Sequence, residues 1–191
     1  VLTKCVNKCV YILYQYQSLP IEDKPVYIYG FELTLSTIVS FVSIIIYSLF
    51  THNLSDPTVF FLSFFVLRLF CGGYHASTFG KCYLLTNSVF VVISVTTTLI
   101  IDWSYYYFLY SIPIASTIII WCFSPITNKN HPITHRTFLA NKKHARRISI
   151  VLLSVILIAL WFPCSRRIYI FASIAYGFVA IMMIIELIKR R

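Results

Sequence analysis

Charged residues are scarce in this sequence. They make up 12% of its 191 residues, whereas 59% are hydrophobic, and a soluble domain would carry roughly twice that charged share. The deficit excludes an ordinary soluble domain. The apolar runs also lack the polar and apolar alternation of a membrane β-barrel, so α-helices remain as the way to satisfy the backbone in lipid. We therefore predict an all-α polytopic membrane protein with a single membrane-embedded domain over residues 1–191.

Acidic residues are scarcer still, six against sixteen lysines and arginines, which gives a net charge of +10. In a soluble protein this surplus would suggest nucleic acid. Here the basic residues flank apolar segments and form no basic face interleaved with aromatic residues. We therefore expect no nucleic-acid partner and interpret the basic residues as topology signals for the lipid bilayer.

Paired cysteine spacing is also lacking, because the six cysteines are scattered and most lie in or beside apolar runs. A disulfide framework is therefore not expected. Cys5 and Cys9 are four residues apart and could share a helix face, yet no nearby histidine or cysteine completes a zinc set. We expect no metal and no other cofactor.

What the sequence does contain is a series of apolar runs that predict about six spanning or partly spanning helices. They cover residues 33–50, 58–70, 83–101, 105–122, 148–163 and 168–188. Within an N-terminal segment over 1–30, residues 2–17 carry apolar side chains at helical spacing. This spacing predicts an amphipathic helix on the membrane surface.

The basic residues predict the orientation of these helices. With six crossings and a cytoplasmic N-terminus, all lysines and arginines except Arg166 and Arg167 fall on the inner side, as the positive-inside rule requires. Both termini and a basic loop over 123–147 are then cytoplasmic. Asp56 and Asp102 are expected on the outer side.

The second apolar run is too short to cross the hydrocarbon cleanly, because residues 58–70 give roughly 20 Å of helix against about 30 Å of hydrocarbon. A double glycine follows, and then a polar stretch that completes a segment over 71–82. Irregular backbone at membrane depth is tolerated only where protein or a water-filled cavity surrounds it, so this segment is expected to line a cavity open to the cytoplasm. Ionisable residues there are functional candidates.

His75 and Cys82 are the sharpest candidate pair in this segment, because an imidazole can take the proton of a thiol and return it to a leaving amine. On one continuous helix, their spacing of seven residues is about 10.5 Å, too far for direct proton transfer. If they act together, the chain between them must fold back or break, and Gly72, Gly73 and Gly80 concentrate the required freedom there. Residue types alone leave open a structural histidine and an uninvolved cysteine.

The run from Arg68 to Ser77, followed by Cys82, resembles the signature of the AgrB family, the membrane endopeptidases of Gram-positive peptide quorum sensing. That signature has an arginine, a double glycine, a histidine two residues later and a cysteine seven beyond it, all present here at matching spacing. Residues 124–132 are similar to the family's proline-bounded polar loop after the fourth span, although His131 stands where a basic residue is commoner. The resemblance covers nearly the whole chain.

The resemblance implies a cysteine endopeptidase that cleaves the C-terminal part of an AgrD-type propeptide. His75 and Cys82 would form the catalytic dyad. A thiol or hydroxyl of the propeptide would then displace Cys82 from a thioester acyl-enzyme and close a thiolactone or lactone ring. The resemblance further implies a multi-pass protein of the bacterial cell membrane and a homodimer.

Supporting roles are assigned to the neighbours of this dyad. Backbone amides from Gly72 and Gly73 onward are candidates for holding the oxyanion. Arg68 is either a charge support or an ordinary snorkelling arginine at a helix end.

No acidic third member is obvious, since Asp56 and Asp102 are expected on the opposite side. A backbone carbonyl, Ser77 or Asn87 is left to orient His75.

A dense basic cluster has two interpretations. Topology alone accounts for most such clusters, whereas docking of the acidic C-terminal region of the propeptide would give it a substrate-binding role. The cluster consists of Lys142, Lys143, Arg146 and Arg147.

Two other function classes stay open. A non-catalytic transporter or scaffold for a peptide would be expected to place polar pairs facing one another inside the bundle, and the predicted spans contain almost no charges. A metal-dependent membrane enzyme would need a ligand set that the five histidines do not provide near Cys82.

Overall fold

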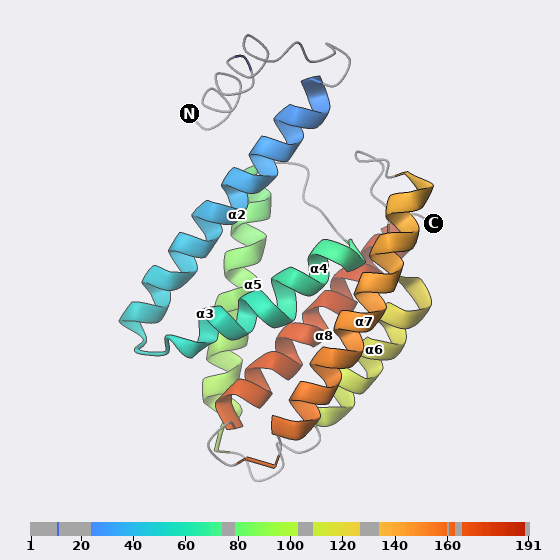
Figure 1. Cartoon of the computed structure of the whole chain (residues 1–191). Helices are drawn as coiled ribbons and strands as arrows, with labels where there is room; N and C mark the ends of the chain where they lie inside the picture. The colour runs from blue at the N-terminus through green and yellow to red at the C-terminus, as the bar shows by residue number, and fades with distance from the viewer. Residues whose placement is uncertain are drawn as a thin grey trace.

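The protein is a bundle of helices, seen in a computed structural model of the whole chain (Figure 1). The structure describes Tyr11 and residues 24–73, 79–102, 109–126, 134–159, 161–162 and 166–189. Within these ranges the chain is helical and has no strand, which confirms the predicted all-α class. The surface helix predicted over 2–17 lies outside the described residues apart from Tyr11, so it stays a prediction.

Successive helical segments alternate in direction along the bundle, and α8 lies between α5 on one side and α6 and α7 on the other (Figure 1). Each predicted apolar run overlaps helical structure. The elements are α2 (Lys24–Phe50), α3 (Ser55–Phe60), the π-helical segment η2 (Phe61–Phe65), α4 (Val66–Cys71), α5 (Phe79–Ile100), α6 (Ser111–Phe123), α7 (His135–Ala159) and α8 (Arg166–Lys189).

Two helical stretches, Gly80–Ile100 and Arg166–Lys189, are long and apolar enough to cross a membrane by length and composition. Thr34–Phe50 and Ser111–Phe123 are shorter apolar helices. The count of six crossings therefore stays a prediction.

The second apolar run belongs to a longer helical segment than the sequence suggested. The segment begins at Ser55 and continues through α3, η2 and α4 to Cys71, which gives about 25 Å at 1.5 Å per residue. Pro57 is accommodated because it lies in the first turn of the helix. Backbone N–H groups there have no intrahelical acceptor, so the missing N–H of proline breaks no hydrogen bond. The first turn contains Ser55 and Asp56, so it was not part of the predicted apolar run.

The basic loop predicted over 123–147 is wrong in its second half, because α7 already begins at His135. Lysine, arginine and alanine are good helix formers, so the basic stretch continues the following apolar run as one helix. The basic side chains are therefore held on a rigid surface.

Small polar residues of α2 face the bundle, together with Ile44, while most of its large apolar residues face outward. Ser36, Ser40 and Ser48 are buried at helical spacing, whereas Ile46 and Phe50 are exposed. This arrangement is the reverse of a soluble helix and is typical of membrane helices, which pack through small residues and turn apolar side chains to lipid. It supports the placement of the bundle in a bilayer.

Close approach of α6 and α8 forms the centre of the bundle. A Cβ added at Gly177 would lie 2.7 Å from Cγ2 of Ile112, so a glycine is needed for this spacing. Tyr169, Phe171 and Tyr176 are buried around it. The centre of the bundle therefore provides a firm support for the segment that follows α4.

Candidate functional site

The two motif segments found in the sequence meet at one end of the bundle. The backbone N–H of Ile126 donates to the carbonyl oxygen of Cys71 at 2.9 Å, and Ile126 pairs with Gly72 in a parallel bridge. The sequence contains both segments but carries no signal that they touch. The end of α4 is therefore attached to the polar segment after α6.

The double glycine is required by close backbone approach. Gly72 has φ +69°, and a Cβ there would overlap the carbonyl oxygen of Ile126. Gly73 has φ +119°, and a Cβ there would lie 3.5 Å from the backbone nitrogen of Met183 in α8. Both glycines therefore adopt conformations that other residues rarely accept.

Gly80 was predicted to share this role, but it lies inside α5. An added Cβ would meet nothing within 4 Å there. Among the described residues, the conformational freedom of glycine is thus used at the end of α4 and not at the start of α5.

Cys82 lies in the first turn of α5 and is half-buried. The turn is held in place by the neighbouring Tyr83, whose hydroxyl lies 2.9 Å from Oγ of Ser43 in α2. Cys82 is thus partly accessible on a well-fixed helix end.

Cys71 is close to the same region but has a different environment. Its exposed fraction is 0%, and a thiol buried in apolar surroundings is inert as a nucleophile. Between these two cysteines, Cys82 is therefore the better candidate.

His75 and Ser77 lie outside the described residues. The distance from the imidazole to the thiol of Cys82 is thus not part of the described geometry. The catalytic dyad stays a prediction, and so does the role of Ser77.

Arg68 is buried, with an exposed fraction of 8%, which is unlike a snorkelling arginine. Its guanidinium carbon lies 5.6 Å from the ring centre of Phe64. Its carbonyl oxygen accepts a hydrogen bond of 3.0 Å from the N–H of Gly72, so that amide is engaged as the end of α4. The role of Arg68 as a charge support and the binding of an oxyanion by nearby amides stay predictions.

Asn87 was one of the residues predicted to orient His75. Its Nδ2 donates to the carbonyl oxygen of Tyr83 at 2.9 Å within α5. The amide nitrogen is therefore engaged within its own helix.

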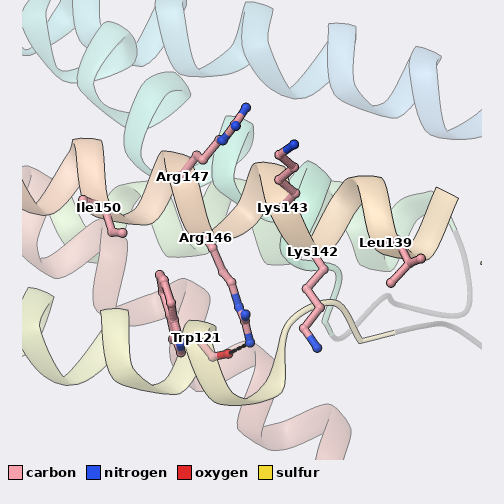
Figure 2. Close-up of a pocket in the computed structure, with 7 residues that line it drawn as sticks. All are labelled: Trp121, Leu139, Lys142, Lys143, Arg146, Arg147 and Ile150. Atoms are coloured by element: carbon pink, nitrogen blue, oxygen red, sulfur yellow. Dashed lines mark hydrogen bonds between the residues drawn. The ribbon is translucent and has the colours of Figure 1, made fainter. Parts of the chain in front are cut away.

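The four clustered basic residues line one groove but point in two directions (Figure 2). Arg146 and Lys142 extend toward α6, whereas Arg147 and Lys143 extend to the other side of α7. Nη2 of Arg146 donates to the carbonyl oxygen of Trp121 at 2.8 Å, and the guanidinium carbon lies 4.7 Å from that ring centre. Arg146 therefore connects α7 to α6, while Lys143 and Arg147 are exposed.

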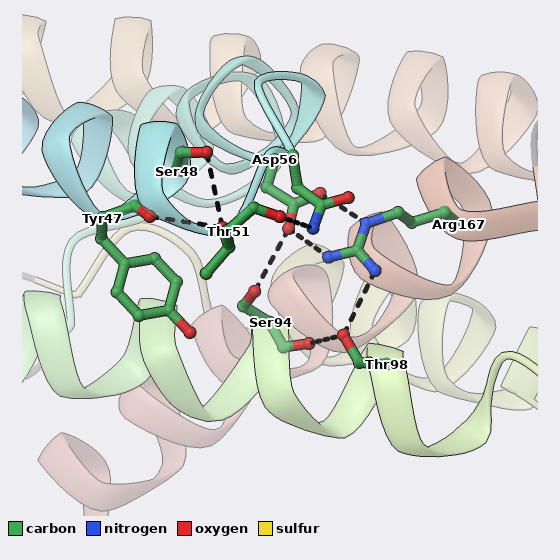
Figure 3. Close-up of polar contacts among 8 residues, drawn as sticks. Tyr47, Ser48, Thr51, Asp56, Ser94, Thr98 and Arg167 are labelled. Carbon is green, nitrogen blue, oxygen red and sulfur yellow. Dashed lines mark hydrogen bonds and ion pairs between the residues drawn. The ribbon is translucent and has the colours of Figure 1, made fainter.

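An ion pair between buried Asp56 and half-buried Arg167 holds the opposite end of the bundle together (Figure 3). Arg167 donates to both carboxylate oxygens of Asp56, from Nε at 2.9 Å and from Nη2 at 2.6 Å. Ser94 donates to the same carboxylate at 3.2 Å, and Thr98 accepts from Nη1 of Arg167 at 3.2 Å. Asp56 therefore neutralises Arg167, one of the two arginines predicted on the outer side.

The ion pair is a charged pair inside the bundle, which is the feature expected of a transporter. It lies far from Cys82, since Thr98 is sixteen residues further along α5, or about 24 Å.

Among the described residues, no group of three or more histidine, cysteine or acidic side chains could hold a metal.

Nearly the whole chain, residues 6–187, matches the sequence profile of one family, described as Accessory gene regulator B. No curated protein and no solved structure is similar enough to match. The profile covers both motif segments and the basic part of α7, and it confirms the resemblance found in the sequence. The family is membrane-associated and takes part in the processing of agr quorum-sensing propeptides.

Proposed function

The chain belongs to the accessory gene regulator B family, and on that premise we propose that it is a membrane-bound cysteine endopeptidase that cleaves an AgrD-type propeptide and promotes its cyclisation. The observation that carries the proposal is the joining of the two motif segments at Gly72 and Ile126, next in the chain to the segment that leads to Cys82. The half-buried thiol on a fixed helix start supports it.

Cleavage begins with Cys82 as the nucleophile. Its sulfur attacks the scissile carbonyl carbon while the thiol proton passes to His75. The carbon–nitrogen bond then breaks, His75 returns the proton to the leaving amine, and the N-terminal part of the propeptide stays on Cys82 as a thioester.

Ring closure follows as an acyl transfer. A thiol or hydroxyl of the bound peptide attacks the thioester carbonyl, its proton passes through His75 to the leaving sulfur of Cys82, and a thiolactone or lactone is released. Water attacking the same thioester would give a linear peptide. A site shielded from water by the bilayer and the bundle favours the cyclic product.

The experiment that tests this proposal is co-expression with a candidate AgrD-type propeptide, followed by mass spectrometry of the products. Wild-type protein is expected to give a cleaved, cyclised peptide, and Cys82→Ala and His75→Ala are each expected to abolish cleavage. Cys71→Ala is the matched control, because Cys71 is a buried cysteine at the end of α4 and this variant should retain cleavage. Undiminished cleavage by Cys82→Ala would overturn the proposal.

The second candidate function is a peptide transporter or scaffold, which the buried pair of Asp56 and Arg167 favours. A transporter would move the propeptide across vesicles without cutting it. Intact peptide recovered from the vesicle interior would support transport, and cleaved peptide would support the endopeptidase. The homodimer predicted from the sequence is tested separately by cross-linking in membranes.

A further inference from the structure

A groove between α6 and α7 combines positive charge with exposed apolar side chains (Figure 2). It has a volume of about 330 Å³, at the lower end of the range of small-molecule sites. Trp121 lines it from α6, and Leu139, Lys142, Arg146 and Ile150 line it from α7. The reaction proposed for Cys82 makes no use of this groove.

The positive charge of the groove is not balanced by the two helices that form it, because α6 and α7 contain no acidic residue. Arg146 donates from Nη2 to the carbonyl oxygen of Trp121, but its Nε is buried and has no acceptor among the described residues. Lys142 extends toward α6 beside it (Figure 2). Both side chains therefore attract an anionic group to the space between the helices.

The apolar part of the groove continues along α6. Ile114, Ile118 and Trp121 follow one another at spacings of four and three residues, so they share one helix face, and all three are exposed. On α7, which packs against α6, Ile150 is one turn beyond Arg146 and is also exposed. The groove thus fits a partner with an anionic end and a long apolar part better than it fits a wholly polar acidic peptide.

The cations of the groove lie where α7 changes from polar to apolar. The helix begins with polar and basic residues at His135, and after Arg147 it is apolar except for two serines, Ser149 and Ser154. In a membrane protein, such a change marks the level of the lipid head groups, where tryptophan is also enriched. Lys142, Arg146 and Trp121 are therefore at the depth of a lipid phosphate.

We propose that this groove binds one anionic phospholipid. Its phosphate lies between Lys142 and Arg146, and an acyl chain follows Trp121 and Ile118 along α6. Basic pockets between membrane helices are a known way to recognise such head groups. The proposal does not depend on the catalytic role of Cys82.

The test measures the quenching of Trp121 fluorescence by phospholipids with bromine on their acyl chains, in the full chain reconstituted in vesicles. Trp103→Phe and Trp161→Phe first remove the other two tryptophans. The vesicles contain equal amounts of phosphatidylglycerol and phosphatidylcholine, with bromine on one lipid or on the other. Brominated phosphatidylglycerol is expected to quench Trp121 more strongly, because the groove concentrates the anionic lipid.

A neighbouring lysine provides the matched control. Lys142→Gln is expected to reduce the preference for phosphatidylglycerol about fivefold, whereas Lys142→Arg keeps the charge and should retain it. Lys143→Gln removes the same charge one residue further on, but this side chain extends to the other side of α7 (Figure 2). That variant should therefore retain most of the preference.

Three outcomes would overturn the proposal. Equal quenching by the two brominated lipids with Lys142 intact would show that the groove selects no anionic lipid. Equal losses of the preference in Lys142→Gln and Lys143→Gln would show a general attraction of the basic surface and no defined site.

The third outcome identifies an acidic peptide as the occupant. In that case phosphatidylglycerol shows no preferential quenching, and a glutamate-rich peptide added to the same vesicles changes the fluorescence of Trp121. Loss of this change in Lys142→Gln would assign the groove to peptide binding.

Discussion

The two ends of the bundle are held together in different ways. The ion-pair end is joined by charged and hydroxyl side chains from α3, α5 and α8, and the glycine end is joined by backbone contacts. We define the ion-pair end by Asp56, Ser94, Thr98 and Arg167. We define the glycine end by Gly72, Gly73 and Ile126.

The difference is between attachment by polar side chains and attachment by backbone contacts. At the ion-pair end, the polar side chains satisfy one another and are thereby unavailable for chemistry. At the glycine end, a backbone hydrogen bond and the close approach at two glycines join the segments without side-chain contacts. The substitutions below separate the two kinds of attachment, from the largest expected effect to the smallest.

Removing the charge of Asp56 is expected to have the largest effect on stability. Asp56→Asn leaves Arg167 without its carboxylate, and loss of one partner of a buried pair costs about 3 kcal/mol. Thermal unfolding in detergent should show the loss. Cleavage per folded molecule should stay at the wild-type level, because the pair is remote from Cys82.

The controls for this prediction use the same chemistry elsewhere. Asp102→Asn removes an exposed carboxylate and should leave the unfolding temperature unchanged. The double substitution Asp56→Asn with Arg167→Gln should recover part of the lost stability, since no unpaired charge then remains. A loss of cleavage per folded molecule in Asp56→Asn would contradict the separation of the two ends.

Adding one methyl group at Gly72 is the second prediction. Gly72→Ala forces an alanine into a positive φ and against the carbonyl of Ile126, which costs about 2 kcal/mol of backbone strain. Cleavage should fall more than stability, because the bridge to Ile126 must open. Parallel cleavage assays and unfolding curves in detergent measure the two effects.

Gly80→Ala is the matched control. Its Cβ would meet open space inside α5, and alanine is a better helix former than glycine. Unchanged or slightly raised stability with normal cleavage is expected. Equal losses of cleavage in both variants would show that the position of the glycine does not matter.

The sequence predicted the all-α class and singled out the double glycine. It did not predict the contacts between distant parts of the chain. Composition and long apolar runs indicate helices because lipid leaves the backbone no other solution. The pairing of Asp56 with Arg167 joins residues 111 positions apart, and no local pattern encodes such a contact. The only hint was that Asp56 and Arg167 were both predicted on the outer side of the membrane.

The apolar pattern also failed to predict where a helix begins when its first turns are polar. Residues 135–147 were assigned to a loop because charge was taken to end the helix, whereas helix propensity continues through lysine and arginine.

The third prediction separates two neighbouring arginines of α7. Arg146→Gln removes a hydrogen bond to Trp121 and a cation–π contact, which together cost about 1 kcal/mol of unfolding free energy. Arg147→Gln changes an exposed side chain and should shift stability by less than about 0.5 kcal/mol. Unfolding in detergent measures both, and equal losses would contradict the two directions seen in Figure 2.

The smallest expected effect on stability comes from the exposed pair of α7, and it tests whether the basic cluster does more than set topology. Lys143→Gln with Arg147→Gln should leave the unfolding temperature and kcat unchanged but raise the KM for a propeptide with an acidic C-terminal region about threefold, because rim charges steer a partner more than they hold it. Added salt should reduce the difference between variant and wild type, since it screens exposed charges. The matched variant Arg146→Gln should lower stability without this salt-sensitive change in KM. Unchanged KM in the double variant would leave Lys143 and Arg147 with a topological role alone, and the glycine end would then bind its substrate without help from α7.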